Sequence, residues 1–117
     1  MPWIVAFADE FEPEFDALPE AVQDAILVRL VFLEREGPFL GRPHADTLVD
    51  SRHANMKELR CNADDGVWRV AFAFDPARQA ILLVGGDKSG VSEKRFYKQL
   101  IARADERFDR HLAQREG

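Results

Sequence analysis

Two arginines, Arg60 and Arg69, lie in neighbouring β-prone stretches of the sequence, where their side chains could neutralise a phosphate group. A guanidinium group grips phosphate through two parallel hydrogen bonds, and such donors stabilise the charge that develops during phosphoryl transfer. Glu58 precedes Arg60 by two residues, so the alternation of side chains along a strand places both on one face. Together these residues could bind a phosphodiester and move a proton. They could equally form a cross-strand ion pair with no chemical role.

The stretch from Asn55 to Lys88 must position these residues, and it has the pattern of an antiparallel meander. Three runs suited to strands are separated by turn-forming clusters at 62–66 and 75–78. Bulky apolar residues alternate with other residues along the second run, which predicts that the bulky face is buried and that Arg69 lies on the opposite, accessible face. At such a position, replacing Arg69 by alanine is expected to change the free energy of unfolding by no more than about 1 kcal/mol. The third run, 80–84, is apolar throughout, which predicts a strand covered on both faces. The predicted bulky face consists of Trp68, Val70, Phe72 and Phe74.

Before the meander, the sequence predicts one strand and two helices. Residues 3–7 suit an edge or partner strand, and a short helix follows with Asp9 as its candidate N-cap. Pro19 is expected to open a longer helix that runs to about Glu36 and ends at Gly37. Residues 38–54 are expected to be irregular, with two leucines fixing this loop to the core. The predicted buried stripe of the longer helix is Val22, Ile26, Leu30 and Leu33, and the loop leucines are Leu40 and Leu48.

A final helix is expected from Ser92, its cap, to about Gln114. Its apolar residues recur every fourth position, which predicts one buried stripe. The whole pattern indicates an α+β fold: a small antiparallel sheet with two N-terminal helices and one C-terminal helix, in a single domain spanning 1–117. The residues of the predicted stripe are Phe96, Leu100, Ala104, Phe108 and Leu112.

The composition limits the classes of function. The 117-residue chain is 46% apolar and carries a net charge of −5, which indicates a globular protein and argues against a general nucleic-acid binder. Residues 1–50 hold 11 acidic and 3 basic side chains, whereas residues 51–117 hold 10 and 13. The single cysteine, Cys61, excludes an intramolecular disulfide framework and a cysteine-rich zinc site. We expect no metal and no cofactor, and a cytoplasmic location.

Four motifs, in this order, resemble the RelE/ParE toxin superfamily, and more narrowly its phage-related HigB-like branch. They are Met-Lys-Glu-Leu-Arg at 56–60, Trp-Arg-Val-Ala-Phe at 68–72, the run to Gly-Gly-Asp-Lys at 80–88, and Phe-Tyr at 96–97. The resemblance implies a type II toxin and a cognate helix-turn-helix antitoxin. Many members cut messenger RNA on the ribosome, whereas ParE members poison DNA gyrase. The expected function is therefore a ribosome-dependent endoribonuclease using metal-free 2′-OH attack; the alternatives are a gyrase inhibitor and a phage-derived binding protein.

The resemblance also implies candidate site residues. Arg69 matches an arginine of the family, Lys88 a basic position near the catalytic centre, and Tyr97 a site tyrosine, whereas Glu58 stands where RelE carries a lysine. Lys88 could instead be an ordinary turn residue, and Tyr97 could lie at the edge of the core. The predicted catalytic set is Arg69, Arg60, Lys88, Glu58, His53 and Tyr97, and the predicted RNA-binding set is Lys57, Arg52, Lys94 and Lys98.

The acidic segment 9–24 holds seven acids and no base. We expect it to serve as a docking surface for basic residues of the antitoxin or the ribosome. Opposite charges on two partners mainly accelerate their association.

Overall fold

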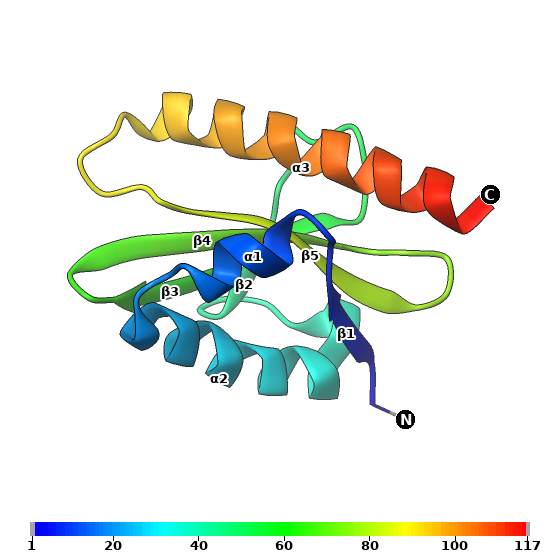
Figure 1. The fold of residues 1–117 in the computed structure, drawn as a ribbon, viewed down its shortest axis with the longest axis horizontal. Coiled ribbons are helices and arrows are strands. Elements are labelled where there is room, and N and C mark those ends of the chain that lie inside the picture. Colours follow the sequence, from blue (N-terminus) through cyan, green and yellow to red (C-terminus); the bar gives the residue numbers. More distant parts are fainter. Residues whose placement is uncertain (1, 117) are drawn as a thin grey trace.

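The computed structural model describes residues 2–116 and shows a five-stranded sheet between helices (Figure 1). The strands are ordered β1-β5-β4-β3-β2; β1 runs parallel to β5, and the other neighbours are antiparallel. Helix α3 covers one face and α2 the other, and α1 packs against β5. The predicted α+β class is confirmed. In chain order the elements are β1 Ile4–Phe7, α1 Phe11–Asp16, α2 Glu20–Glu36, the 3-10 turn η1 Gly37–Phe39, β2 Ala45–Thr47, β3 Met56–Ala63, β4 Gly66–Phe74, β5 Gln79–Asp87 and α3 Glu93–Glu116.

The two faces of β4 have the predicted characters. Val70 and Phe72 are completely buried, and Phe74 is nearly so, whereas Trp68 is only half-buried. Directly paired residues share a face of a sheet, so the pairing of Val70 with Leu59 extends this apolar face onto β3, which α2 covers. Small alanines fill the opposite face of β4, which lets α3 pack closely on it.

The first turn of the meander is a two-residue hairpin loop. Asp64 and Asp65 connect β3 to β4 and both have positive φ, 51° and 59°. Two consecutive residues of this conformation form the turn whose twist matches that of paired strands. This turn fixes the register of β3 on β4, and with it the relative position of Arg60 and Arg69.

The helices follow the predicted patterns, with two corrections. All four residues of the predicted α2 stripe are buried, and the Ser92 hydroxyl accepts the Arg95 backbone N–H at 3.2 Å as a cap of α3. The expected cap at Asp9 is wrong, because α1 begins one residue later and the cap position, Glu10, makes no side-chain cap hydrogen bond. Residues 38–54 are not wholly irregular either, because β2 pairs with β3 there.

Within residues 2–116, no helix is long and apolar enough to cross a membrane.

The acidic arm formed by α1 pairs with α3 of the same chain. The two carboxylate oxygens of Glu14 accept hydrogen bonds from Nη1 and Nη2 of Arg107, both at 2.7 Å. Glu10 accepts a hydrogen bond from Arg110 at 2.6 Å. Arg107 also donates to the backbone oxygen of Leu83, in β5 where the pairing with β4 shifts. These two acids therefore stabilise the fold from within, which reduces the charge the arm can offer to a partner.

Glu14→Gln is expected to reduce the acid sensitivity of the fold. The hydrogen bonds from Arg107 hold the pKa of Glu14 below its ordinary value of 4.5. A depressed folded-state pKa gives stability that is present above the unfolded pKa and is lost as the pH falls through the folded pKa. Because Glu14 is half-exposed, the contribution is at most about 1 kcal/mol. Urea unfolding of both proteins at pH 7 and at pH 3 checks this; an unchanged pH dependence would contradict it.

Candidate active site

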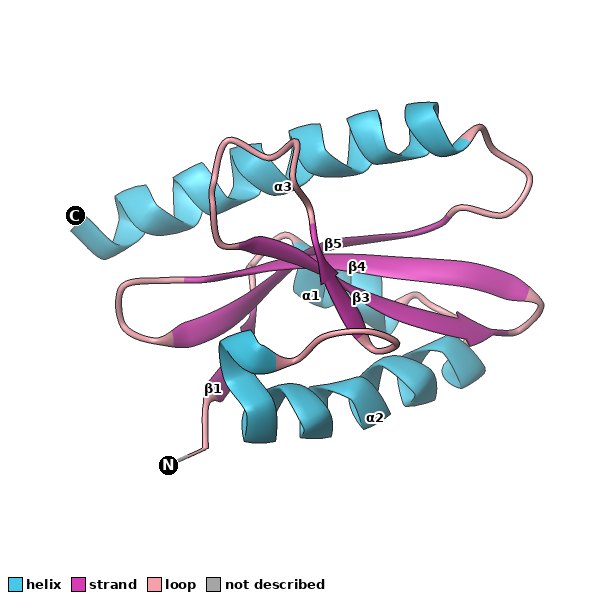
Figure 2. Ribbon diagram, turned by 180° about the vertical axis from the view of Figure 1, so that it is seen from behind, coloured by secondary structure: helices cyan, strands magenta, loops and turns pink. Residues whose placement is uncertain are grey.

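An open groove of about 870 Å³ lies between α3, strands β2 and β3, and the loop that follows β2. Figure 2 shows this loop rising from the sheet toward α3. The groove lies on the α3 face, where Glu58 and Arg60 of β3 contribute to its lining. Its cationic lining residues are Arg42, Arg52, Arg60, Lys94 and Lys98, and its anionic ones are Asp46, Asp50, Glu58, Glu93 and Asp105.

Four of the predicted catalytic residues are close together at this groove, centred on the carboxylate of Glu58. Arg60 and Arg69 are directly opposite each other in the pairing of β3 with β4. Glu58 Oε2 accepts a hydrogen bond from Arg60 Nη1 at 2.8 Å, and Oε1 accepts one from the Tyr97 hydroxyl at 2.8 Å. Oε1 also lies 3.8 Å from Arg69 Nε. The cross-strand ion pair that the sequence left open is therefore present.

Arg69 is buried, which corrects the expected accessible position. Its residue exposure is 5%, because α3 covers the face of β4 that carries it. Its Nη1 donates to the backbone oxygen of Trp68 at 2.9 Å, whereas its buried Nε has no hydrogen-bond acceptor among residues 2–116. Alternation along a strand correctly predicted the face of this side chain but not its depth.

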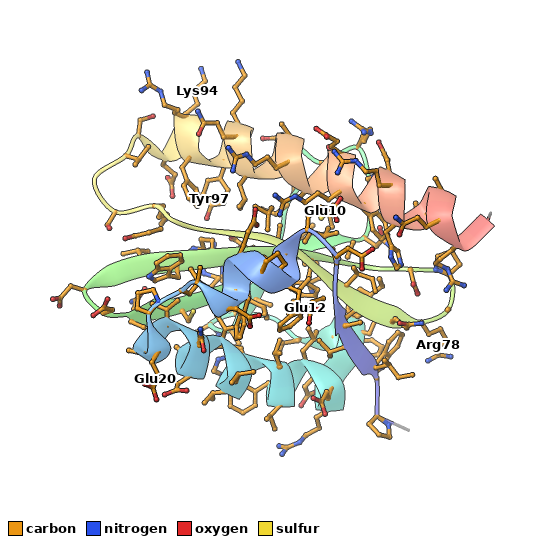
Figure 3. All side chains as sticks on the ribbon, in the orientation of Figure 1. Glu10, Glu12, Glu20, Arg78, Lys94 and Tyr97 are labelled. Atoms are coloured by element: carbon orange, nitrogen blue, oxygen red, sulfur yellow. The ribbon has the colours of Figure 1, made fainter. Side chains whose placement is uncertain are left out.

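Tyr97 connects α3 to the sheet. Figure 3 shows its side chain pointing from the helix toward the strands, whereas Lys94 points outward at the start of the same helix. Burial raises the pKa of Tyr97, its hydrogen bond to Glu58 raises it further, and the nearby Arg69 partly opposes both. The hydroxyl is thus protonated near neutral pH and is available as a hydrogen-bond donor.

Comparison with known proteins gives the family of this chain. The model for phage-derived Gp49-like proteins matches residues 13–109. A protein named as a candidate toxin, HigB3 of Mycobacterium tuberculosis, is 46% identical over 113 residues, which cover 97% of this chain and 96% of that protein. The chain belongs to the Gp49-like family of phage-derived proteins. The resemblance to HigB-like members of the RelE/ParE superfamily is confirmed.

Two further matches agree with this. A second protein of the same organism, named as candidate toxin HigB2, is 45% identical over 102 residues. These residues make up 86% of the Gp49-like chain but only 50% of HigB2. Among solved structures, a mutant of the Escherichia coli toxin RelE in its free state superimposes with a TM-score of 0.63 over 87% of this chain and 96% of RelE. At 12% sequence identity, this match shows a shared fold.

Arg69 is not among the residues that line the groove, and the two other predicted catalytic residues of this Gp49-like protein also lie outside its lining. Lys88 is adjacent to the Glu58 cluster: its Nζ lies over the Tyr97 ring, 5.7 Å from the ring centre, and donates to Glu93 at 2.8 Å. His53 contacts a different part of α3, where its Nε2 lies 2.8 Å from Asp109. His53 thus belongs to the attachment of the loop, and no contact joins it to Glu58.

The predicted RNA-binding residues divide between the groove and the opposite face of the sheet. Lys94 and Lys98 are exposed on α3 and line the groove, as does Arg52 on the loop. Lys57 follows the alternation of β3 to the α2 face, where its ammonium donates to the backbone oxygens of Pro38 and Leu40 at 3.0 and 2.6 Å. Burial lowers the pKa of Lys57.

Asp105 is a site residue that the sequence analysis missed. It lies on α3, is 5% exposed, and accepts hydrogen bonds from the Ser51 hydroxyl at 2.5 Å and the Arg52 backbone N–H at 3.3 Å. These bonds attach the loop to the helix and so set the width of the groove. The only signal in the sequence was an acid beside the buried stripe of α3.

Within residues 2–116, no three His, Cys, Asp or Glu side chains are arranged to hold a metal ion.

Proposed function

We propose that this protein is the toxin of a type II toxin–antitoxin system and that it cleaves messenger RNA on the ribosome. Its similarity to proteins named as HigB toxins supports the first part. The observation that carries the second part is the cluster of Glu58, Arg60, Arg69 and Tyr97 beside a groove. This cluster offers cations, a protonated hydroxyl and a carboxylate together, which are the groups that metal-free phosphoryl transfer to a 2′-OH requires.

The proposed reaction assigns one role to each group. The ribose 2′-oxygen attacks the adjacent phosphorus, and its proton passes to Glu58. Arg60 and Arg69 stabilise the negative charge on the phosphoryl oxygens. The bond from phosphorus to the 5′-oxygen breaks, and Tyr97 gives its proton to that oxygen. The products are a 2′,3′-cyclic phosphate and a 5′-hydroxyl end, and the need for a 2′-OH restricts the reaction to RNA.

The remaining cations of the groove would bind the flanking phosphates. Lys94 and Lys98 project from α3 beside the cluster, and Arg52 contributes from the loop. Lys88 would hold Tyr97 in position, because its ammonium group lies over the tyrosine ring. In the cell, the proposed partners are a helix-turn-helix antitoxin and, in the cytoplasm, the translating ribosome with its messenger RNA.

The proposed function is tested by mapping the 5′ ends of messenger RNA after induction of the wild-type protein and of Tyr97→Phe. The wild type is expected to produce new 5′-hydroxyl ends within translated regions, together with growth arrest. Tyr97→Phe keeps the ring beside Lys88 and Phe96 but removes the proton donor, so cleavage is expected to fall by on the order of 100-fold or more. Equal thermal unfolding midpoints of the two proteins would show that the fold is unchanged.

One result would reject the ribonuclease, and another would reject only the role of Tyr97. Growth arrest with intact messenger RNA and inhibited supercoiling by DNA gyrase would instead indicate a ParE-like inhibitor. Cleavage by Tyr97→Phe at the wild-type rate would remove Tyr97 from the mechanism. The antitoxin is tested separately, by asking whether a helix-turn-helix protein encoded beside this one binds it and restores growth.

A further inference from the structure

We infer that Glu58 occupies the phosphate subsite of the groove in the free protein, as an internal anion that a phosphodiester of the substrate must displace. This inference rests on the proposed function and deepens it, because it describes how the site is held before substrate arrives. The ligand class is a phosphodiester of an RNA strand. Glu58 then has two positions, one between the arginines in the free protein and one beside the 2′-OH in the complex.

The first observation is the set of donors around the carboxylate. Arg60 and Tyr97 each donate to a different oxygen of Glu58 at 2.8 Å, and Arg69 Nε lies 3.8 Å from one of them. A phosphodiester, like a carboxylate, presents two oxygens that share one negative charge and accept hydrogen bonds from donors of this kind. Glu58 is 3% exposed, so its charge competes directly with an incoming phosphate for the same groups.

The second observation is the unused donor on Arg69. A buried N–H without an acceptor is costly, and such groups in a folded protein often indicate a missing partner. Arg69 Nε is buried, and no residue of 2–116 accepts its hydrogen bond, because Glu58 is too distant at 3.8 Å. A phosphate oxygen placed between the two arginines would supply that acceptor.

The rest of the groove shows the same self-neutralisation. Arg42 pairs with Asp46 at 2.8 Å, and Arg52 lies 3.9 Å from Asp105. Lys94 and Lys98 are the groove cations that make no ion pair within residues 2–116. We therefore expect these two exposed lysines to make the first contact with an RNA strand, and the paired cations to engage only when their own carboxylates give way.

The test compares the affinity of wild type and Glu58→Gln for a short 2′-O-methyl RNA, which has phosphodiesters but no 2′-OH to react. Glutamine keeps the size and one acceptor of the side chain and removes its charge. We expect Glu58→Gln to bind this RNA on the order of 10- to 100-fold more tightly, since a like charge beside the phosphate opposes binding. Glu93→Gln is the matched control: it removes a charge from the exposed rim of the groove, so its effect should be severalfold smaller.

Equal or weaker binding by Glu58→Gln would overturn the inference, and so would a gain no larger than that of Glu93→Gln or no detectable binding by either protein. Equal unfolding midpoints exclude misfolding as the cause. The outcome is separable from the proposed function, because binding is measured without cleavage. If messenger RNA is cut in cells but Glu58→Gln does not bind more tightly, only the displacement fails. If the proposed function and the displacement of Glu58 are both correct, Glu58→Gln binds RNA more tightly than the wild type but cuts it more slowly, because it has also lost the proton acceptor.

Discussion

Replacing Arg69 by lysine is expected to leave the chain folded and to slow cleavage of messenger RNA by on the order of 10- to 100-fold. Lysine keeps the positive charge beside Glu58 but loses the planar fork of the guanidinium group. Alanine removes the donor altogether and is expected to cost on the order of 100- to 1000-fold. The measurement is the rate at which messenger RNA is cut on translating ribosomes by each purified variant.

The stability of the two Arg69 variants must be measured beside their activity. Because Arg69 is buried next to Glu58, alanine leaves a buried carboxylate with one fewer cation, and breaking such a pair costs up to about 3–5 kcal/mol. Arg95→Lys, on the exposed side of α3, is the matched control and should change neither rate nor stability. Arg69→Lys that folds normally and cuts RNA at the wild-type rate would remove the guanidinium from the proposed mechanism.

Phe72→Ala is expected to lower the free energy of unfolding by about 3–5 kcal/mol, enough to unfold many domains of this size. Phe72 has no exposed surface and packs edge-to-face on Phe74, with ring centres 5.7 Å apart. Phe39→Ala provides the control, because that ring is 89% exposed and should change stability by no more than about 0.5 kcal/mol. Urea unfolding measures both. Similar losses in the two variants would contradict the assignment of the core.

The features that the sequence predicted well are those with a repeating pattern. Alternation along β4 correctly placed Arg69 opposite the face of Phe72, and the spacing of apolar residues correctly gave the buried stripe of α2. Strand β2 was missed because three residues are too few to show any alternation. The same alternation placed Lys57 on the face away from Glu58, although the sequence analysis grouped both with the site.

The features that could not be predicted depend on contacts between distant parts of the chain. The burial of Arg69 follows from the way α3 crosses the sheet, and no local pattern reports it. The bonds from Asp105 to Ser51 and Arg52 join residues more than fifty positions apart. Tyr97 was identified as a candidate site residue through the resemblance to a family. Its hydroxyl donates to Glu58, which is 39 positions away in the sequence. A polar contact of this kind leaves no periodic trace in the sequence.

The groove is built from elements that the ribosome makes at different times. Strands β3 and β4, which carry Glu58, Arg60 and Arg69, are complete once residue 74 has been added, whereas Tyr97 and Asp105 come later, on α3. A nascent chain can begin to fold while it is still attached to the ribosome. During that interval the arginines are present, but helix α3, which forms the second wall of the groove and carries the Tyr97 hydroxyl, is not. The chain thus emerges beside the ribosome, its proposed target, before its proposed active site is complete.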